Sequence, residues 1–185
     1  PELKGQLASA DKIDNPNWRL LPNYKLSRLD EIRLAFVIEE EVRKGNLIKW
    51  HPGMPMPKHA SPAFVADRKG HKTGRLVVDF RHYNRQVVNP VFSIPETADI
   101  LERMSAPGAE YFGVSDLATG YFHAVLAESE RDFLAISSST GVYIPTKLQI
   151  GPSWAPSWFQ SRSRSAFTSR FDIYIDDIVW RCTSD

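Results

Sequence analysis

The sequence predicts an α+β fold, because one strongly periodic helical segment is mixed with several hairpin patterns. The helix is expected at about residues 28–44. Hairpins are expected within residues 63–80 and 133–145, where apolar β-forming runs flank turns that contain glycine or serine. A last strand pair is expected at residues 171–180, close to the end of the chain.

The first helix has both a start and a stop signal. Ser27 and Asp30 form a capping box before it, and Gly45 ends it. The apolar residues that recur at helical spacing between these signals are Leu29, Ile32, Phe36 and Val42. The proline-broken residues 1–24 before the helix and residues 51–62 after it favour extended segments.

The first hairpin joins strands at about 63–66 and 76–80 through a basic turn. Arg68, Lys69 and Arg75 lie in or beside this turn. One interpretation is an ordinary solvated turn. The other is that these cations bind triphosphate oxygens, a task that suits the planar guanidinium group.

The remaining elements are predicted from shorter patterns. Periodicity alone does not decide between strand and helix for residues 120–126. The other expected elements are a helix at 95–104, a strand at 111–114 leading to Asp116, strands at 133–136 and 142–145, and a helix from about 153 to 166.

Composition limits the class of protein. The chain has 185 residues, 42% of them hydrophobic, which is enough to bury a core, and a net charge of +1 that does not by itself indicate nucleic-acid binding. The single cysteine, Cys182, excludes an intrachain disulfide, and the histidines lack metal-ligand spacing. We expect no membrane helix and no secretory leader. Because the first residue is Pro1, we expect a fragment of a longer protein.

The most informative residues are the carboxylates Asp116, Asp176 and Asp177. The Asp-Asp pair follows Tyr174-Ile175 inside an apolar β-forming run, where charges are costly unless something neutralises them. The alternatives are a solvated Asp-Asp turn and a helix cap at Asp116. If the two strand ends lie side by side, the carboxylates form a cluster of hard oxygen ligands for a cation such as Mg²⁺.

Several common catalytic motifs are absent from the sequence. It contains no Gly-x-x-x-x-Gly-Lys-Ser/Thr loop, no Gly-x-Ser-x-Gly elbow and no Gly-x-Gly-x-x-Gly fingerprint. These absences argue against the usual kinase, hydrolase and dehydrogenase interpretations.

In order along the chain, the segments resemble the reverse transcriptases of long-terminal-repeat retrotransposons and retroviruses, especially the Ty3/gypsy group. The resemblance runs from about Tyr24 to the end of the chain. It is carried by Ser61-Pro62-Ala63-Phe64-Val65, by residues 74–84, by Ser115-Asp116-Leu117-Ala118-Thr119-Gly120-Tyr121-Phe122, by residues 148–160 and by Tyr174-Ile175-Asp176-Asp177.

The resemblance implies the fingers and palm of a right-hand polymerase, with an antiparallel palm sheet packed on helices. The fingers would comprise residues 1–88 and 124–154, and the palm residues 89–123 and 155–185. The thumb, connection and RNase H regions of the family have no counterpart in this sequence.

The resemblance also assigns roles to residues. Asp116, Asp176 and Asp177 would be the catalytic carboxylates and would hold two Mg²⁺ ions, or Mn²⁺, with the backbone carbonyl of Leu117 as a further ligand. Nucleotide-binding residues would include Arg75 with Arg68 or Lys69 at the phosphates, Tyr121 under the sugar, and Ile150 and Gly151 at the pocket wall.

Two departures from the family pattern stand out. Ile150 replaces the Gln or Phe that usually precedes the glycine of the second motif, which makes the expected pocket wall apolar. The segment from Gln160 to Phe171 is shorter and more polar than the family helix, by about one turn of 3.6 residues. The helix either keeps its buried face in register or is damaged.

The expected function is RNA-directed DNA polymerisation, a nucleotidyltransferase reaction that extends a primer with deoxynucleotides. The expected partners are an RNA or DNA template with its primer, deoxynucleotide triphosphates, and the thumb, RNase H and integrase regions of a parent polyprotein. A cytoplasmic virus-like particle or the nucleus is the expected location. The alternatives are a non-catalytic descendant that binds nucleic acid or a protein, and a purely structural subunit whose aromatic surface packs on a partner.

Overall fold

The chain forms two compact units that the computed structural model describes over residues 18–68, 71–87, 95–108, 110–117, 119–167 and 171–182. The first unit comprises Pro1–Val88 and Tyr121–Ser153, and the second comprises Asn89–Gly120 and Trp154–Asp185. A 3₁₀ helix at Gly120–His123 begins where the chain passes from the second unit back to the first. The expected fingers and palm segments change over at residues 88, 123 and 154.

The first unit is built on a five-stranded sheet in the order β1-β6-β5-β2-β3. Strands β2 and β5 are parallel, and the other neighbours are antiparallel. Its elements are α1 (Arg28–Arg43), β1 (Leu47–Lys49), β2 (Ala60–Arg68), β3 (His71–Val78), α2 (Arg81–Asn84), α4 (Glu128–Arg131), β5 (Ala135–Ser138) and β6 (Gly141–Pro145).

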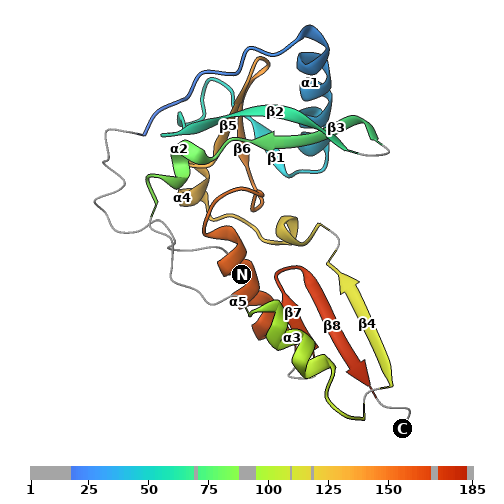
Figure 1. Cartoon of the computed structure of the whole chain (residues 1–185). Coiled ribbons are helices and arrows are strands. Elements are labelled where there is room, and N and C mark those ends of the chain that lie inside the picture. The colour runs from blue at the N-terminus through green and yellow to red at the C-terminus, as the bar shows by residue number, and fades with distance from the viewer. Residues whose placement is uncertain are drawn as a thin grey trace. The chain divides into compact units, whose positions relative to one another are not determined.

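Helix α1 contacts β1, β2 and β3 (Figure 1). It buries Leu34, Val37 and Ile38. The Ser27 hydroxyl accepts a hydrogen bond from the Asp30 amide at 3.1 Å, so the expected start signal is confirmed. The apolar residues at helical spacing in the sequence are on another face, because Leu29 is 65% and Ile32 61% exposed.

A cluster of rings holds the start of the described chain against the sheet. Trp18 packs on His59, Tyr83 and Phe133 at centroid distances of 5.3, 5.8 and 5.1 Å. His59 is fully buried, and its Nδ1 lies 2.7 Å from the carbonyl oxygen of Arg19. Burial lowers the pKa of His59 to about 4, because a charged imidazolium would lose its hydration.

The second unit is smaller and has an antiparallel three-stranded sheet in the order β4-β8-β7. Helix α5 contacts β7, and β4 forms the opposite edge of the sheet (Figure 1). Its elements are α3 (Thr97–Met104), β4 (Tyr111–Asp116), α5 (Ala155–Ala166), β7 (Phe171–Tyr174) and β8 (Asp177–Cys182).

The structure confirms the α+β class and most of the expected elements, including the strand pair at residues 171–180. It also decides the doubtful helix, because α5 continues without a break to Ala166. Its buried residues are Ala155, Phe159, Gln160 and Ser163, a spacing that keeps one helical face in register. None of the helices in the described ranges has the length and apolar character needed to cross a membrane.

Candidate active site

The second unit brings the predicted acidic residues together through strand pairing. Strands β4 and β8 are antiparallel, and their register places the Cα atom of Asp116 opposite that of Asp177. Side chains directly opposite each other in an antiparallel pair point to the same face, with Cβ atoms about 5 Å apart. The sequence expectation that residue 116 lies beside the 176–177 pair is therefore met by the backbone.

The pair of acids sits on the turn between β7 and β8. Tyr174 pairs with Asp177, which leaves Ile175 and Asp176 as a two-residue loop. The φ angle is +58° at Ile175 and is not positive at Asp176, the pattern of a type II′ turn. A β-branched residue in this region is a conformational outlier that costs about 1–3 kcal/mol, so neighbouring contacts must hold it there.

One such contact joins the turn to the end of β4. The Leu117 amide donates to the carbonyl oxygen of Asp176 at 2.9 Å. This bond continues the β4–β8 pairing past Asp116 and fixes the loop against the neighbouring strand. The expectation that the carbonyl of Leu117 serves as a metal ligand stays a prediction.

A close contact inside the sheet fixes the same register. Gly113 pairs with Trp180, and a Cβ atom at position 113 would lie 2.1 Å from the ring atom Cε2. The indole therefore occupies the space in which any other residue would place its side chain. This contact leaves only glycine compatible with the observed position of Trp180.

The three carboxylates supply some, but not all, of the oxygen ligands that a hard divalent cation needs. Asp116 is exposed and Asp176 and Asp177 are half-buried, so solvent and ligands have access to the turn. Within the described residues, no three His, Cys, Asp or Glu side chains converge closely enough to hold one ion. Mg²⁺ is commonly held by one or two carboxylates plus substrate phosphates, and two like charges opposite each other on a sheet favour a neutralising cation.

The predicted phosphate-binding cations are described only in part. Arg75 is exposed on β3, where it pairs with Ala66 of β2. Lys69 and the side chain of Arg68 lie outside the described residues. Arg75 belongs to the first unit, whereas the acidic residues belong to the second.

The loop with the predicted pocket-wall residues is clamped within the first unit. Asn84 donates from Nδ2 to the carbonyl oxygen of Gly151 at 3.0 Å and accepts from the Ser153 amide at 2.8 Å. Gly151 has φ +125°, and a Cβ atom there would lie 2.8 Å from Cδ2 of Phe80. The glycine is therefore required by the protein's own packing, whereas Ile150 is 67% exposed.

Two further features of the first unit are the position of Tyr121 and the polar contacts at the end of β3. Tyr121 is half-buried in the 3₁₀ helix, in the first unit. At the end of β3, the Arg81 guanidinium donates to the Asp79 carboxylate at 2.6–3.1 Å and keeps the pKa of Asp79 well below its usual range. Tyr24 also donates to Asp79, which ties the segment before α1 to this corner.

Sequence reasoning assigned no role to Gln160 or Asn84. Gln160 is fully buried, and its amide bonds to the backbone of the turn that carries the acids. Asn84 holds the loop at residues 151–153. Both side chains act through backbone groups far away along the chain, and a local sequence pattern gives no signal for such bonds.

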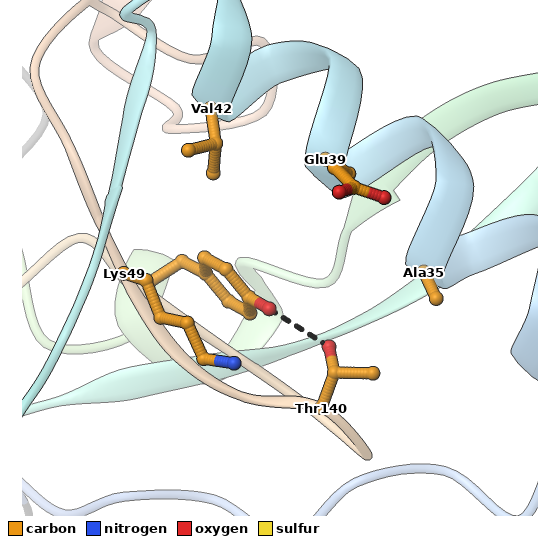
Figure 2. Close-up of a pocket in the computed structure, with 6 residues that line it drawn as sticks. Ala35, Glu39, Val42, Lys49 and Thr140 are labelled. Atoms are coloured by element: carbon orange, nitrogen blue, oxygen red, sulfur yellow. Dashed lines mark hydrogen bonds between the residues drawn. The ribbon is translucent and has the colours of Figure 1, made fainter.

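A separate cavity of about 310 Å³ lies in the first unit and contains none of the predicted site residues (Figure 2). The Thr140 and Tyr143 hydroxyls bond to each other at 2.9 Å in its wall, and the Lys49 Nζ lies 5.9 Å from the centroid of the Tyr143 ring. The lining residues are Ala35, Glu39, Val42, Lys49, Thr140 and Tyr143.

The chain has a reverse transcriptase fold, and this fold defines its structural class. The chain superposes on a foamy viral protease-reverse transcriptase in complex with double-stranded DNA with a TM-score of 0.75, over 90% of this chain and 28% of that chain, at 19% identity. It superposes on the same kind of protein in complex with an RNA/DNA hybrid with a TM-score of 0.73, over 90% of this chain and 22% of that chain, at 18% identity.

Relatives in sequence identify the kind of polyprotein. The chain is 30% identical over 177 residues to the retrovirus-related Pol polyprotein from transposon 412 of Drosophila melanogaster, covering 91% of the chain and 14% of that polyprotein. It is 28% identical to a putative enzymatic polyprotein of Cassava vein mosaic virus, over 84% of the chain and 24% of that polyprotein. No family model matches the chain. The chain is thus a reverse transcriptase-related homologue of retrotransposon and caulimovirus Pol polyproteins, and it spans less than a quarter of these two relatives.

Proposed function

We propose that the chain carries the catalytic core of an RNA-directed DNA polymerase, which adds deoxynucleotides to a primer on an RNA or DNA template. The observation that carries this proposal is the pairing of Asp116 with Asp177, together with the Asp176–Leu117 bond beside it. The homology to Pol polyproteins supports the reaction class.

In this proposal, Asp116, Asp176 and Asp177 would share two Mg²⁺ ions, or Mn²⁺ in their place, with one or two carboxylates and substrate phosphates at each ion. The bound metal would activate the primer 3′-hydroxyl and neutralise charge on the triphosphate. Arg75, with Arg68 or Lys69, binds the phosphates, and Tyr121 contacts the sugar. Gly151 brings the backbone of its loop close to the nucleotide, beside the apolar side chain of Ile150.

The test is primer extension on an oligo-dT-primed poly-A template with Mg²⁺. We expect Asp176→Asn to reduce incorporation by at least about 100-fold, since even the outer partners of metal ligands are worth 10–100-fold. The matched control is Asp99→Asn, which removes an exposed carboxylate from α3 of the same unit and should leave incorporation unchanged. Equal incorporation by the chain and by Asp176→Asn rejects the proposal.

Ligand-induced stabilisation gives a second, independent readout. Mg²⁺ with a deoxynucleotide triphosphate at about 100 times its dissociation constant should stabilise the folded chain by roughly 2.7 kcal/mol. The Asp176→Asn variant should lose this stabilisation. A protein that binds primer–template but shows neither incorporation nor a nucleotide-dependent shift has the non-catalytic function instead.

One observation favours a different non-catalytic function, in which the chain binds a protein. The edge strand β4 exposes Phe112 by 59% and Val114 by 69%, and apolar side chains exposed together on an edge strand are typical of a surface that another chain covers. In that case the chain would bind a protein partner without synthesis, and Asp176→Asn would have no effect on binding.

A further inference from the structure

The turn that carries the predicted metal-binding pair has an unfavourable backbone conformation. Ile175 has φ +58°, and Thr119 is the only other non-glycine residue with positive φ in the described ranges. The first loop position of a type II′ turn normally favours glycine, because L side chains clash there. Something other than the residue's own preference must therefore keep Ile175 in this conformation.

Gln160 supplies the contacts that do so. It lies on α5, is fully buried, and donates from Nε2 to the carbonyl oxygen of Ile173 at 2.6 Å. Its Oε1 accepts a hydrogen bond from the amide of Ile175 itself. The two bonds bracket Tyr174 and hold the last part of β7 and the first loop residue against the helix.

The effect of these bonds extends to the acidic residues. The residue after Ile175 is Asp176, whose carbonyl oxygen is bonded to the Leu117 amide at 2.9 Å. Asp177 follows and pairs with Asp116. A change at Ile175 would rotate the peptide that leads into Asp176, so the contacts of Gln160 control how the turn meets the end of β4.

We propose that Gln160 is a positioning residue, whose side-chain amide holds Ile175 in the left-handed conformation and thereby places Asp176 and Asp177 beside Asp116. The expected effect of Gln160 on nucleotide incorporation rests on the proposed polymerase function. The expected effect of Gln160 on the conformation of the turn does not, so the positioning role and the polymerase function can be rejected separately.

The first experiment uses NMR to measure the rate of hydrogen exchange at the Ile175 amide in the whole chain. Gln160→Met keeps the volume and the apolar contacts but removes both hydrogen bonds. We expect exchange at Ile175 to accelerate by roughly two- to tenfold, the effect of one lost hydrogen bond. The matched control is Ser163→Ala, the next buried polar residue on the same face of α5, which should leave that amide unchanged.

The second experiment uses glycine to remove the need for the clamp. Gln160→Met should lower incorporation by about tenfold or more and raise the Mg²⁺ concentration for half-maximal incorporation, as loss of an outer-shell partner does. Adding Ile175→Gly should restore part of both, because glycine adopts positive φ without strain. A residue that only stabilised the helix would show no such rescue.

The outcomes separate the two proposals. If the unmodified chain incorporates no nucleotide, the polymerase proposal fails, and the exchange rates alone decide the role of Gln160. Equal exchange at Ile175 in the chain and in Gln160→Met overturns the positioning role. The positioning role is also overturned if Gln160→Met loses incorporation and the added Ile175→Gly change does not restore any of it. If Gln160→Met does not fold, the double variant is expected to fold, and its failure also overturns the proposal.

Discussion

The two units of the chain differ in how each one is stabilised internally. In the first unit, all four residues of β5 are buried, and rings of Trp18, Tyr83 and Phe133 pack around the buried His59. In the second unit, β4 is exposed at every position except the half-buried Gly113. Among the strands of that unit, only Ile173 and Ile178 are buried.

This difference shows where the precision of the candidate site comes from. The first unit is specified by a core, so each single contact contributes a small part of its stability. The sheet of the second unit has little core, and its register depends on a few specific contacts, notably Gly113 against Trp180 and Gln160 against the turn. Changes to these contacts are expected to disturb the acidic residues more than comparable changes elsewhere.

The largest effect is expected from Gly113→Ala. The new methyl group would lie 2.1 Å from Cε2 of Trp180, so either the ring or the strand must move. We expect a loss of at least about 3 kcal/mol in the free energy of unfolding, the upper end of the usual cost of overpacking. Calorimetry measures it as a drop of roughly 12–24 °C in the melting temperature of the second unit, given the small size of that unit.

Two variants test whether the ring is the cause. Ser115→Ala removes only an exposed hydroxyl from the same strand and should change the free energy of unfolding by less than about 0.5 kcal/mol. Gly113→Ala combined with Trp180→Leu, which makes room for the methyl group, should recover part of the loss. If Gly113→Ala is as stable as the unmodified chain, close packing does not specify this sheet, and the contrast between the units is wrong.

A second prediction concerns acid stability in the first unit. The folded state lowers the pKa of His59 from 6.5 to about 4, because the buried ring resists protonation. The unfolded chain therefore binds a proton first as the pH falls. The contribution of His59 to the free energy of unfolding is fully present above pH 6.5. It is lost as the pH falls from 6.5 to about 4, by at most about 3 kcal/mol.

Urea unfolding at pH 7.5 and pH 4.5 measures this loss. His59→Gln, which does not titrate, should lose less stability between the two values than the unmodified chain, whatever its stability at pH 7.5. The exposed His123 provides the matched control, and His123→Gln should keep the full pH dependence. The pKa of the neighbouring His82 is also lowered by burial, so some pH dependence should remain in His59→Gln.

Local patterns predicted the elements, because strand and turn signals are short-range. The expectation that Asp116 lies beside Asp176 and Asp177 came from the family resemblance, since a local pattern leaves open whether two strand ends so far apart along the chain are neighbours. The pattern failed to select the buried face of α1. One apolar stripe contains Leu29 and Ile32, another contains Leu34 and Ile38, and both have helical spacing. Only tertiary packing decides between two such stripes, and it buries the second.

The supporting contacts of the site were beyond sequence reasoning for a different reason. Ile175 is β-branched, and its identity argues against the left-handed turn that it adopts. The bonds from Gln160 that hold this turn join a side chain to backbone groups 13 and 15 residues away. Such strain, held in place by a distant side chain, is typical of functional sites, where local preference and observed structure disagree.

The smallest effect is expected from the ion pair between α3 and β7 in the second unit. Arg103 donates from Nε to the Asp172 carboxylate at 2.9 Å, and the two side chains are 51% and 26% exposed. Solvent screens a pair of this exposure, so a double-mutant cycle with Arg103→Ala and Asp172→Asn should give a coupling of about 0.2–1 kcal/mol. Raising the ionic strength to about 1 M, where the Debye length is about 3 Å, should reduce that coupling further. A coupling above about 2 kcal/mol would mean that charge pairing, and not backbone register with a few close contacts, holds the second unit together.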